Sequence, residues 1–479
     1  MVFSSTLFLF YFLPLQLVLY HLSPRRLQNL VALAGSLLFY AWGAPQFVYV
    51  LIGGTALDYW LSRAIAGTTD ARRRTLCLWA SVLSNLALLL YFKYANFFVD
   101  QVNFILRQVG AGEVTWVKVV LPIGISFFTF QKLSYVVDVY RGTATAARSF
   151  TDCLLYVVLF PQLIAGPIVR YHDVDLQIRS RHHSATLFWR GVERFTLGLV
   201  KKAILANGMA AICDPVFERP VSLVPQSFAW LASLAYYFQI YFDFSGYSDM
   251  AIGLGYMMGF RFLENFERPY VARTFTEFWR RWHMSLSNFM REYIYIPLGG
   301  NRVAPWRGYL NLWIVFLVSG FWHGASWNFV VWGAYQGVFL TIDKLGWLKV
   351  AGRLSAVVLR PAMVFLVMVS WVIFNTKDMT HCVQFLGRMF GGGGPSWTQA
   401  TLNSVMPLDA YSLSLVGLAA LVCFLPWSSR YLGLEAALLR WARTPAGAPV
   451  FGLVVWIGLA LGCLAVVNSS YNPFIYFRF

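Results

Sequence analysis

Charged residues are scarce in this sequence, and disulfide or metal motifs are missing. Only 12% of its 479 residues are charged, whereas 58% are hydrophobic. Ordinary soluble domains contain roughly 25% charged residues, so this composition excludes a protein whose main solvent is water. The six cysteines are scattered in apolar stretches, without a CxxC motif or a Cys/His cluster. We therefore expect neither a disulfide framework nor a metal site.

Signals of several other protein classes are also missing. The sequence contains no G-x-S-x-G elbow, no P-loop, no long polar linker and no convincing inverted repeat. The first apolar run has neither a basic segment before it nor an A-x-A cleavage site, and Arg25 and Arg26 follow it directly. We interpret this run as a first spanning helix rather than as a removed signal peptide.

What the sequence does contain is many long apolar runs, separated by short polar breaks. A helix needs about 20 mostly apolar residues to span a bilayer. We therefore predict an all-α, polytopic integral membrane protein with about 11 to 14 membrane-embedded helices, including re-entrant segments. The clearest apolar runs are Leu7 to Leu22, Leu76 to Phe92, Ala356 to Phe374, Leu413 to Leu425 and Val450 to Val467.

The net charge of +17 is carried by short Lys and Arg clusters between the apolar runs. Membrane proteins concentrate such clusters on cytoplasmic loops, which explains the charge better than a nucleic-acid partner does. We therefore expect no nucleic-acid partner. The alternation of clusters and apolar runs predicts that Arg63 and Arg72 to Arg74 face the cytoplasm, with the amino terminus outside.

One apolar stretch breaks this alternation, because both of its ends are basic. It contains FPQLIAGPIVR, Phe160 to Arg170, in which two prolines and a glycine prevent a continuous helix. We predict a re-entrant segment that lines an internal cavity. The next stretch, Trp189 to Ala211, mixes basic and apolar residues, and we interpret it as lying on the membrane surface.

The stretch Arg273 to Glu292 carries too many charges for a lipid-facing span. Wound as a helix, it separates into an apolar arc and a polar arc, with His283 at their boundary beside Arg280 and Ser287. We predict an amphipathic helix at the interface or along a polar cavity. A membrane-surface helix whose histidine is incidental is the alternative. The polar arc contains Arg273, Glu277, Arg280, Arg281, Ser287, Asn288, Arg291 and Glu292.

His323 lies alone between two long apolar arms, in LNLWIVFLVSGFWHGASWNFVVWGAYQGVFL. A neutral histidine can take a proton from a hydroxyl as that oxygen attacks an acyl carbonyl, and can return it to the leaving group. We predict that His323 is functional; a packing histidine bonded to a backbone carbonyl is the alternative. Gly320 and Gly324, then Gly333 and Gly337, repeat the GxxxG spacing that lets backbones approach closely. Nearby aromatic residues, interpreted as packing, are Phe321, Trp322, Trp327 and Trp332.

Two further carboxylates lie in an apolar context, Asp243 and Asp249 in YFDFSGYSDMAIGLG. They could orient a catalytic base, or they could organise helix packing through hydrogen bonds. We favour packing.

Three internal motifs give the chain a resemblance to the membrane-bound O-acyltransferase (MBOAT) family. They are YFDFSGYSDMAIGLGYMMGFRFLENF, TEFWRRWHMSLSNFMREYIYIPLGGNR and SGFWHGASWNFVVWGAYQG. Within the family the chain is most similar to the AlgI-type, alginate O-acetyltransferase branch. That similarity rests on MVFSSTLFLFYFLP, LPIGISFFTFQKLSYVVDVYRG, LIAGPIVR and the closing SYNPFIYFRF.

The resemblance implies a single MBOAT membrane domain, residues 1–479, whose helices surround a central funnel or tunnel. Within it we expect amino-terminal spans (1–150), a core (151–346) and carboxy-terminal spans (347–479). The resemblance places the family's essential histidine at His323 and its second conserved polar position at His283, as catalytic candidates. Candidate substrate or donor contacts are Arg280, Arg281, Ser287, Asp243 and Asp249.

The resemblance also implies a reaction: acetyl transfer from a cytoplasmic donor, acetyl-CoA, across the bacterial inner membrane to an exported polysaccharide. Alginate is the expected polymer, with cellulose and peptidoglycan as alternatives. The implied partners are a periplasmic or membrane-anchored SGNH-type acetyltransferase and the polysaccharide synthesis and export complex. No permanently bound cofactor is implied. The alternatives from other classes are a transporter or flippase and a structural subunit of an export complex.

Overall fold

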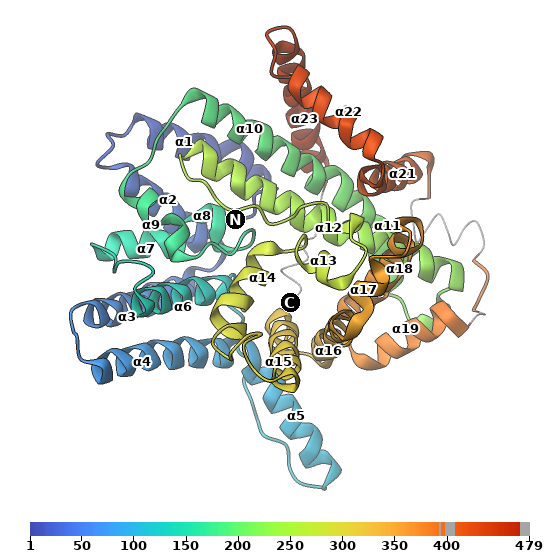
Figure 1. Ribbon diagram of the computed structural model, residues 1–479, viewed down its shortest axis with the longest axis horizontal. Helices are drawn as coiled ribbons and strands as arrows, with labels where there is room; N and C mark the ends of the chain where they lie inside the picture. Colours follow the sequence, from blue (N-terminus) through green and yellow to red (C-terminus); the bar gives the residue numbers. More distant parts are fainter. Residues whose placement is uncertain (392–393, 398–407, 470–479) are drawn as a thin grey trace. The chain divides into compact units, whose positions relative to one another are not determined.

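The computed structural model describes residues 1–391, 394–397 and 408–469, so the closing motif at 470–479 lies outside the described residues. Within these ranges every regular element is a helix, which confirms the predicted all-α class (Figure 1). The chain forms two compact units. The first contains Met1–Val192 and Ala251–Leu263, and the second contains Glu193–Met250 and Glu264–Phe479.

The first unit is a helical assembly in which α3, α4 and α6 pack together. Their interface contains a buried ion pair between Lys132 on α6 and Asp58 on α3, at 3.5 Å. Asn85 on α4 donates to the same carboxylate, which helps to compensate for its desolvation. The helices of this unit are α1 (Leu13–Leu22), α2 (Gln28–Gly43), α3 (Val48–Ala66), α4 (Ala71–Leu89), α5 (Ala95–Gln108), α6 (Ile125–Arg141), α7 (Phe150–Val158), α8 (Phe160–Leu163), α9 (Tyr171–Arg179) and the first half of α10 (Ala185–Val200).

The second unit contains the longest helix, α12 (Gln226–Met257), whose last turns belong to the first unit. Its other helices are α11 (Asn207–Phe217), α13 (Phe275–Trp279), α14 (Met284–Met290), α15 (Pro305–His323), α16 (Trp327–Ile342), α17 (Leu348–Ala351), α18 (Ala356–Asn375), α19 (Met379–Gly391), α21 (Ala410–Phe424), α22 (Ser429–Trp441) and α23 (Gly447–Asn468), and a π-helical segment, η4 (Lys201–Ala206), joins α10 to α11.

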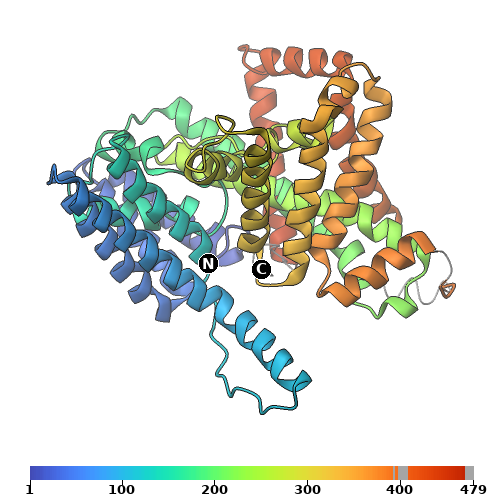
Figure 2. The same cartoon turned by 60° about the horizontal axis from the view of Figure 1, so that its bottom comes forward.

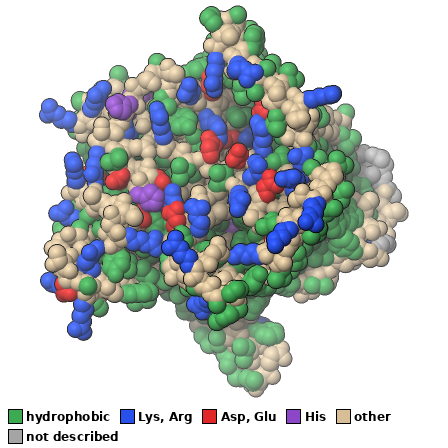
Figure 3. Space-filling view, viewed as in Figure 1, with side chains coloured by type: hydrophobic (Ala, Val, Ile, Leu, Met, Phe, Trp, Pro, Cys, Tyr) green, Lys and Arg blue, Asp and Glu red, His purple; other side chains and the backbone are tan. Residues whose placement is uncertain are grey.

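Five helical stretches among the described residues are long and apolar enough to cross a membrane. Many of their large apolar side chains are exposed, such as Leu453 and Trp456 on α23, as expected where lipid replaces water. Lys and Arg side chains are frequent on the face of the molecule drawn in Figure 3. The five stretches are Ala71–Gln108, Ala185–Phe217, Ala356–Asn375, Ala410–Trp427 and Gly447–Asn468.

The stretch Ala71–Gln108 is continuous over 38 residues, and α5 at its end projects away from the other helices of its unit (Figure 2). At about 1.5 Å per residue it is longer than the roughly 30 Å hydrocarbon core of a bilayer. One end carries Arg72 to Arg74, and beyond the other end lies Glu113. The two ends should therefore lie on opposite sides of the membrane.

We predict that a cysteine in place of Arg72 is protected from an impermeant maleimide in sealed cells, whereas a cysteine in place of Glu113 is labelled. Both positions are exposed, so accessibility would be decided by the side of the membrane. Permeabilised cells, in which both positions should react, provide the control. Labelling at position 72 in sealed cells would show that the predicted orientation is wrong.

The stretch Phe160 to Arg170 is not a straight helix, as its prolines predicted. After α8 the chain is irregular up to Arg170, and all of these residues are buried. The protein itself satisfies part of this backbone: Ser36 Oγ accepts from the Phe160 amide at 3.1 Å, and Tyr156 donates to the Val169 carbonyl at 2.9 Å. Irregular backbone at membrane depth requires such partners. That the segment lines a cavity stays a prediction.

One expectation about local structure stays a prediction, and another was wrong. Trp189 to Ala211, expected on the membrane surface, belongs to Ala185–Phe217, a stretch of 33 residues that is long and apolar enough to cross a membrane. Carboxylates on α12 pair with its cations. Arg273 to Glu292 is not one helix: α13 ends at Trp279 and α14 begins at Met284. The break lies at His283, which has a φ of 43°. Asn265 stabilises this break, because the backbone carbonyl of Asn265 accepts a hydrogen bond from the Met284 amide at 3.0 Å.

Candidate functional site

His323 is the last residue of α15, at the bend of a hairpin formed by α15 and α16. Gly324 follows in an extended conformation and ends the helix. A Cβ atom on Gly320 would lie 2.2 Å from the carbonyl oxygen of Phe329, so only glycine lets the two helices approach this closely. The close approach expected from the GxxxG spacing is confirmed here. The sequence did not predict that the helix ends at the histidine itself.

Aromatic rings surround the imidazole of His323. The ring centroids of Trp322, Trp332 and Phe374 lie 4.9, 5.2 and 5.1 Å from it. His323 keeps 8% of its surface exposed, so it is largely but not fully enclosed. Phe374 comes from α18, far along the chain, and nothing in the sequence pointed to it. Trp327, expected in this wall, is 52% exposed.

His283 lies in the interior of the second unit, not at the edge of an Arg-rich face as its sequence position suggested. It is 1% exposed, and the ring of Phe244 on α12 packs edge-to-face against it at 4.6 Å. On another side the Trp322 ring lies 6.4 Å away. Trp322 therefore neighbours both histidines, and the fold brings them into one cluster.

The electrostatics of this cluster favour a neutral imidazole at His283, which lies outside the five candidate spans. Burial lowers the pKa of His283 well below its usual value, and the neighbouring His323 lowers that pKa further. A neutral histidine has one nitrogen with a proton and one with a free lone pair. Such a group can accept a hydrogen bond or a proton.

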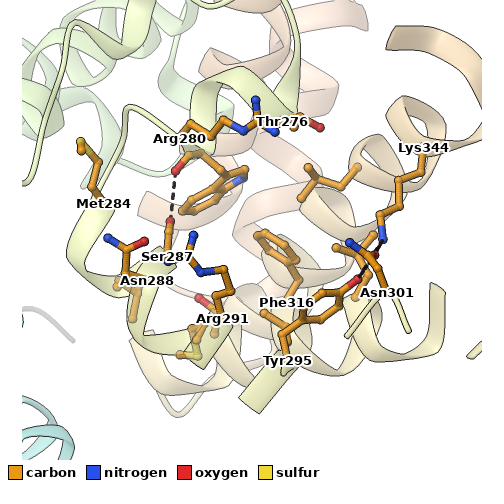
Figure 4. Close-up of a pocket in the computed structure, with 17 residues that line it drawn as sticks. Thr276, Arg280, Met284, Ser287, Asn288, Arg291, Tyr295, Asn301, Phe316 and Lys344 are labelled. Carbon is orange, nitrogen blue, oxygen red and sulfur yellow. Dashed lines mark hydrogen bonds between the residues drawn. The ribbon is translucent and has the colours of Figure 1, made fainter. Parts of the chain in front are cut away.

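A cavity of about 690 Å³ lies along α14 and the α15–α16 hairpin (Figure 4). Ser319, one helical turn before His323 on α15, lines it. Trp279 and Phe316 form part of its apolar wall. The Trp279 ring also contacts Trp332 at 5.8 Å, and Trp332 in turn contacts His323. The wall of the cavity is thus continuous with the aromatic surroundings of the histidine.

The rest of the cavity wall is polar and cationic. Arg280, Arg291 and Lys344 all line it. The Lys344 ammonium donates to the Tyr295 hydroxyl at 3.0 Å and to Asn301 Oδ1 at 3.2 Å, which fixes its position (Figure 4). Cations around an open cavity of this size are suited to an organic anion, and Arg in particular to phosphate.

The donor-binding candidates fall into two groups. Arg280 and Ser287 line the cavity, where Ser287 donates to the Trp279 carbonyl at 3.1 Å. Arg281 does not line it; its guanidinium pairs with Glu277 at 3.2 Å instead. Asn288 and Arg291 of the predicted polar arc also line the cavity, together with Tyr295, Asn301 and Lys344, to which no sequence pattern pointed.

Asp243 and Asp249 on α12 form ion pairs with the helical stretch that begins with α10. Lys202 Nζ lies 2.6 Å from Asp243, and both side chains are 1% exposed. Asp249 binds Lys201 and Arg194, each at 2.7 Å. Neither carboxylate is among the residues that line the cavity. Their position fits the packing interpretation.

Comparison with known proteins gives this geometry its context. The family model described as membrane-bound O-acyltransferase matches residues 144–347, which include both histidines and the cavity. The probable alginate O-acetylase AlgI of Azotobacter vinelandii is 40% identical over the full length of both chains. AlgI of Pseudomonas aeruginosa is 44% identical over 84% of this chain and 77% of its own. The peptidoglycan O-acetyltransferase of Helicobacter pylori is 31% identical over 100% of this chain and 98% of its own.

Proposed function

Because the chain belongs to the membrane-bound O-acyltransferase family, we propose that it takes part in the O-acetylation of an exported polysaccharide, with His323 as its general base. The observation that carries the proposal is the position of His323. His323 ends a helix, and its imidazole lies among three aromatic rings. It does not line the cationic cavity itself, but one of these rings, Trp332, packs against Trp279 in the cavity wall. Alginate is the proposed polymer, since two of the relatives described are named as probable alginate O-acetylases.

The chemistry assigned to His323 is one proton transfer in each direction. Its neutral imidazole takes the proton of an attacking hydroxyl, while that oxygen forms a bond to the acetyl carbonyl carbon. The carbon–sulfur bond of a thioester donor then breaks, and the imidazolium returns the proton to the departing thiolate.

Acetyl-CoA from the cytoplasm is the proposed donor. Its phosphate groups need cationic partners, and Arg280, Arg291 and Lys344 supply them in a cavity large enough for part of such a molecule. The donor would place its thioester toward Ser319, one turn from His323. The inner membrane is the proposed location, and a periplasmic SGNH-type acetyltransferase together with the export complex are the proposed partners.

Replacing Arg280 by Gln is expected to raise KM for acetyl-CoA by roughly ten-fold, the equivalent of losing one hydrogen bond to a charged group. The rate at saturating donor should change less, because Arg280 does not touch the reacting atoms in this proposal. Arg353→Gln is the matched control, since Arg353 is exposed and outside the cavity lining. Equal KM values for the two variants would show that acetyl-CoA does not bind in this cavity.

The proposed reaction is tested by incubating membranes that contain the chain and its partner proteins with acetyl-labelled CoA and alginate. The label should appear in the polysaccharide. Recovery of unlabelled polysaccharide from these membranes would contradict the proposal. A transporter, a flippase or a structural subunit would not transfer the label. Membranes with the His323→Ala variant at matched abundance provide the background.

A further inference from the structure

Asn265 lies in the extended segment after α12, next to the break between α13 and α14 at His283. Its side chain is buried, and the residue is 1% exposed. Its side-chain oxygen accepts from the Ser285 amide at 3.2 Å and from the Ser285 hydroxyl at 2.8 Å. Its side-chain amide donates to Ser248 on α12 at 3.1 Å. Because the Ser285 backbone N–H can only donate, the Asn265 atom that faces it must be the oxygen.

The same oxygen lies 3.1 Å from Nδ1 of His283. A carbonyl oxygen cannot donate a hydrogen bond, and two lone pairs facing each other at this distance would repel. The Ser285 hydroxyl lies farther from Nδ1, at 3.5 Å, and it donates its proton to the Asn265 oxygen at 2.8 Å. We therefore assign a proton to Nδ1. In a neutral imidazole the other nitrogen, Nε2, is then bare.

Nε2 of His283 is buried, and no hydrogen-bond partner lies within reach among the described residues. A buried polar atom without a partner costs free energy, so its position calls for a ligand or a functional reason. The ring of Phe244 packs against the imidazole, and the ring of Trp322 neighbours both His283 and His323.

We propose that Asn265 is a positioning residue for His283: its side-chain oxygen holds the imidazole proton on Nδ1 and keeps Nε2 as a bare hydrogen-bond acceptor beside His323. The inference rests on the proposed function in one respect, that the hydrogen-bond donor to Nε2 is a hydroxyl group of the transfer reaction. Asn265 contacts neither substrate nor reacting atoms, and it acts through His283.

The geometry also predicts what a carboxylate at position 265 would do. Every group that contacts the Asn265 side chain can donate a hydrogen bond: the Ser285 amide, the Ser285 hydroxyl, the Ser248 hydroxyl and His283 Nδ1. Asn265→Asp thus preserves the contacts and adds a negative charge beside the imidazole. That charge favours imidazolium and raises the pKa of His283 by about 1 to 3 units. Among the described residues, His323 is the titratable group whose charge acts on His283 in the wild-type protein, and it lowers the pKa of His283.

The test is the nitrogen NMR spectrum of the full chain in lipid bilayers, with ¹⁵N introduced at histidine. The sequence has 7 histidines, and the spectrum of a His283→Gln variant identifies the signals of His283. At neutral pH we expect a protonated Nδ1 and a bare Nε2. Asn265→Asp should protonate Nε2 at a pH at least about one unit higher than in the wild type. Ser248→Ala, which removes the other hydrogen bond of Asn265, should leave the tautomer unchanged.

Acetyl transfer by the same variants gives a second readout. Asn265→Asp should lose activity several-fold at a pH where its His283 is protonated and the wild-type His283 is not. A proton on Nε2 of the wild type, or identical titration of His283 in wild type and Asn265→Asp, would overturn the inference. An inactive wild type with the expected spectrum would instead count against the proposed function alone.

Discussion

Replacing His323 by Ala should lower acetyl transfer by about 10²- to 10⁴-fold, the usual effect of removing a general base. The side chain lies at a helix end and keeps some exposure, so its loss should leave membrane insertion intact. The measurement is label incorporation into polysaccharide at matched membrane abundance. His182→Ala, at an exposed histidine of the first unit, should transfer label at the wild-type rate.

His283→Ala is the informative comparison. We expect a smaller effect, several-fold, because the loss of one hydrogen bond costs about 1 kcal/mol. Substantial transfer by His323→Ala together with an inactive His283→Ala would reverse the two roles. The base would then be His283, whose neutral, buried imidazole is also capable of accepting a proton.

Breaking the ion pair between Lys202 and Asp243 should strongly lower the stability of the protein. Both side chains are 1% exposed and lie 2.6 Å apart, so Lys202→Met leaves a buried carboxylate without its cation. Removing one partner of such a pair typically costs about 3–5 kcal/mol in the free energy of unfolding. Unfolding of the purified variant in detergent measures this loss directly.

The double variant Lys202→Met/Asp243→Leu distinguishes the ion pair from simple loss of packing. Replacing both partners by apolar residues leaves no buried charge, so most of the lost stability should return. A double variant no more stable than Lys202→Met would contradict this explanation. Arg268→Gln is the control, because its pair with Glu435 is partly exposed and such pairs contribute roughly 1 kcal/mol or less.

The amino-acid sequence alone determined the class of protein and pointed to His323 as a candidate functional residue. Scarce charge and long apolar runs indicated membrane helices, because charged side chains are costly in the hydrocarbon core of a bilayer. A helix also satisfies its own backbone hydrogen bonds there. The two prolines of Phe160 to Arg170 predicted a broken helix, because proline acts locally on the backbone. His323 could be identified as a candidate because ionisable residues are rare in long apolar stretches, and this can be seen without knowing its contacts.

The tertiary structure decided how the charges are paired and where His283 lies. Periodicity placed His283 on a continuous helix, but contacts from Asn265 on a separate segment break that helix and bury the histidine. Phe374 and Lys344 reach the site from distant parts of the chain. From the sequence Lys202 was expected at the membrane surface, but in the structure it is buried in an ion pair with Asp243. In each case the deciding interaction joins residues far apart in sequence, and local patterns carry no information about it.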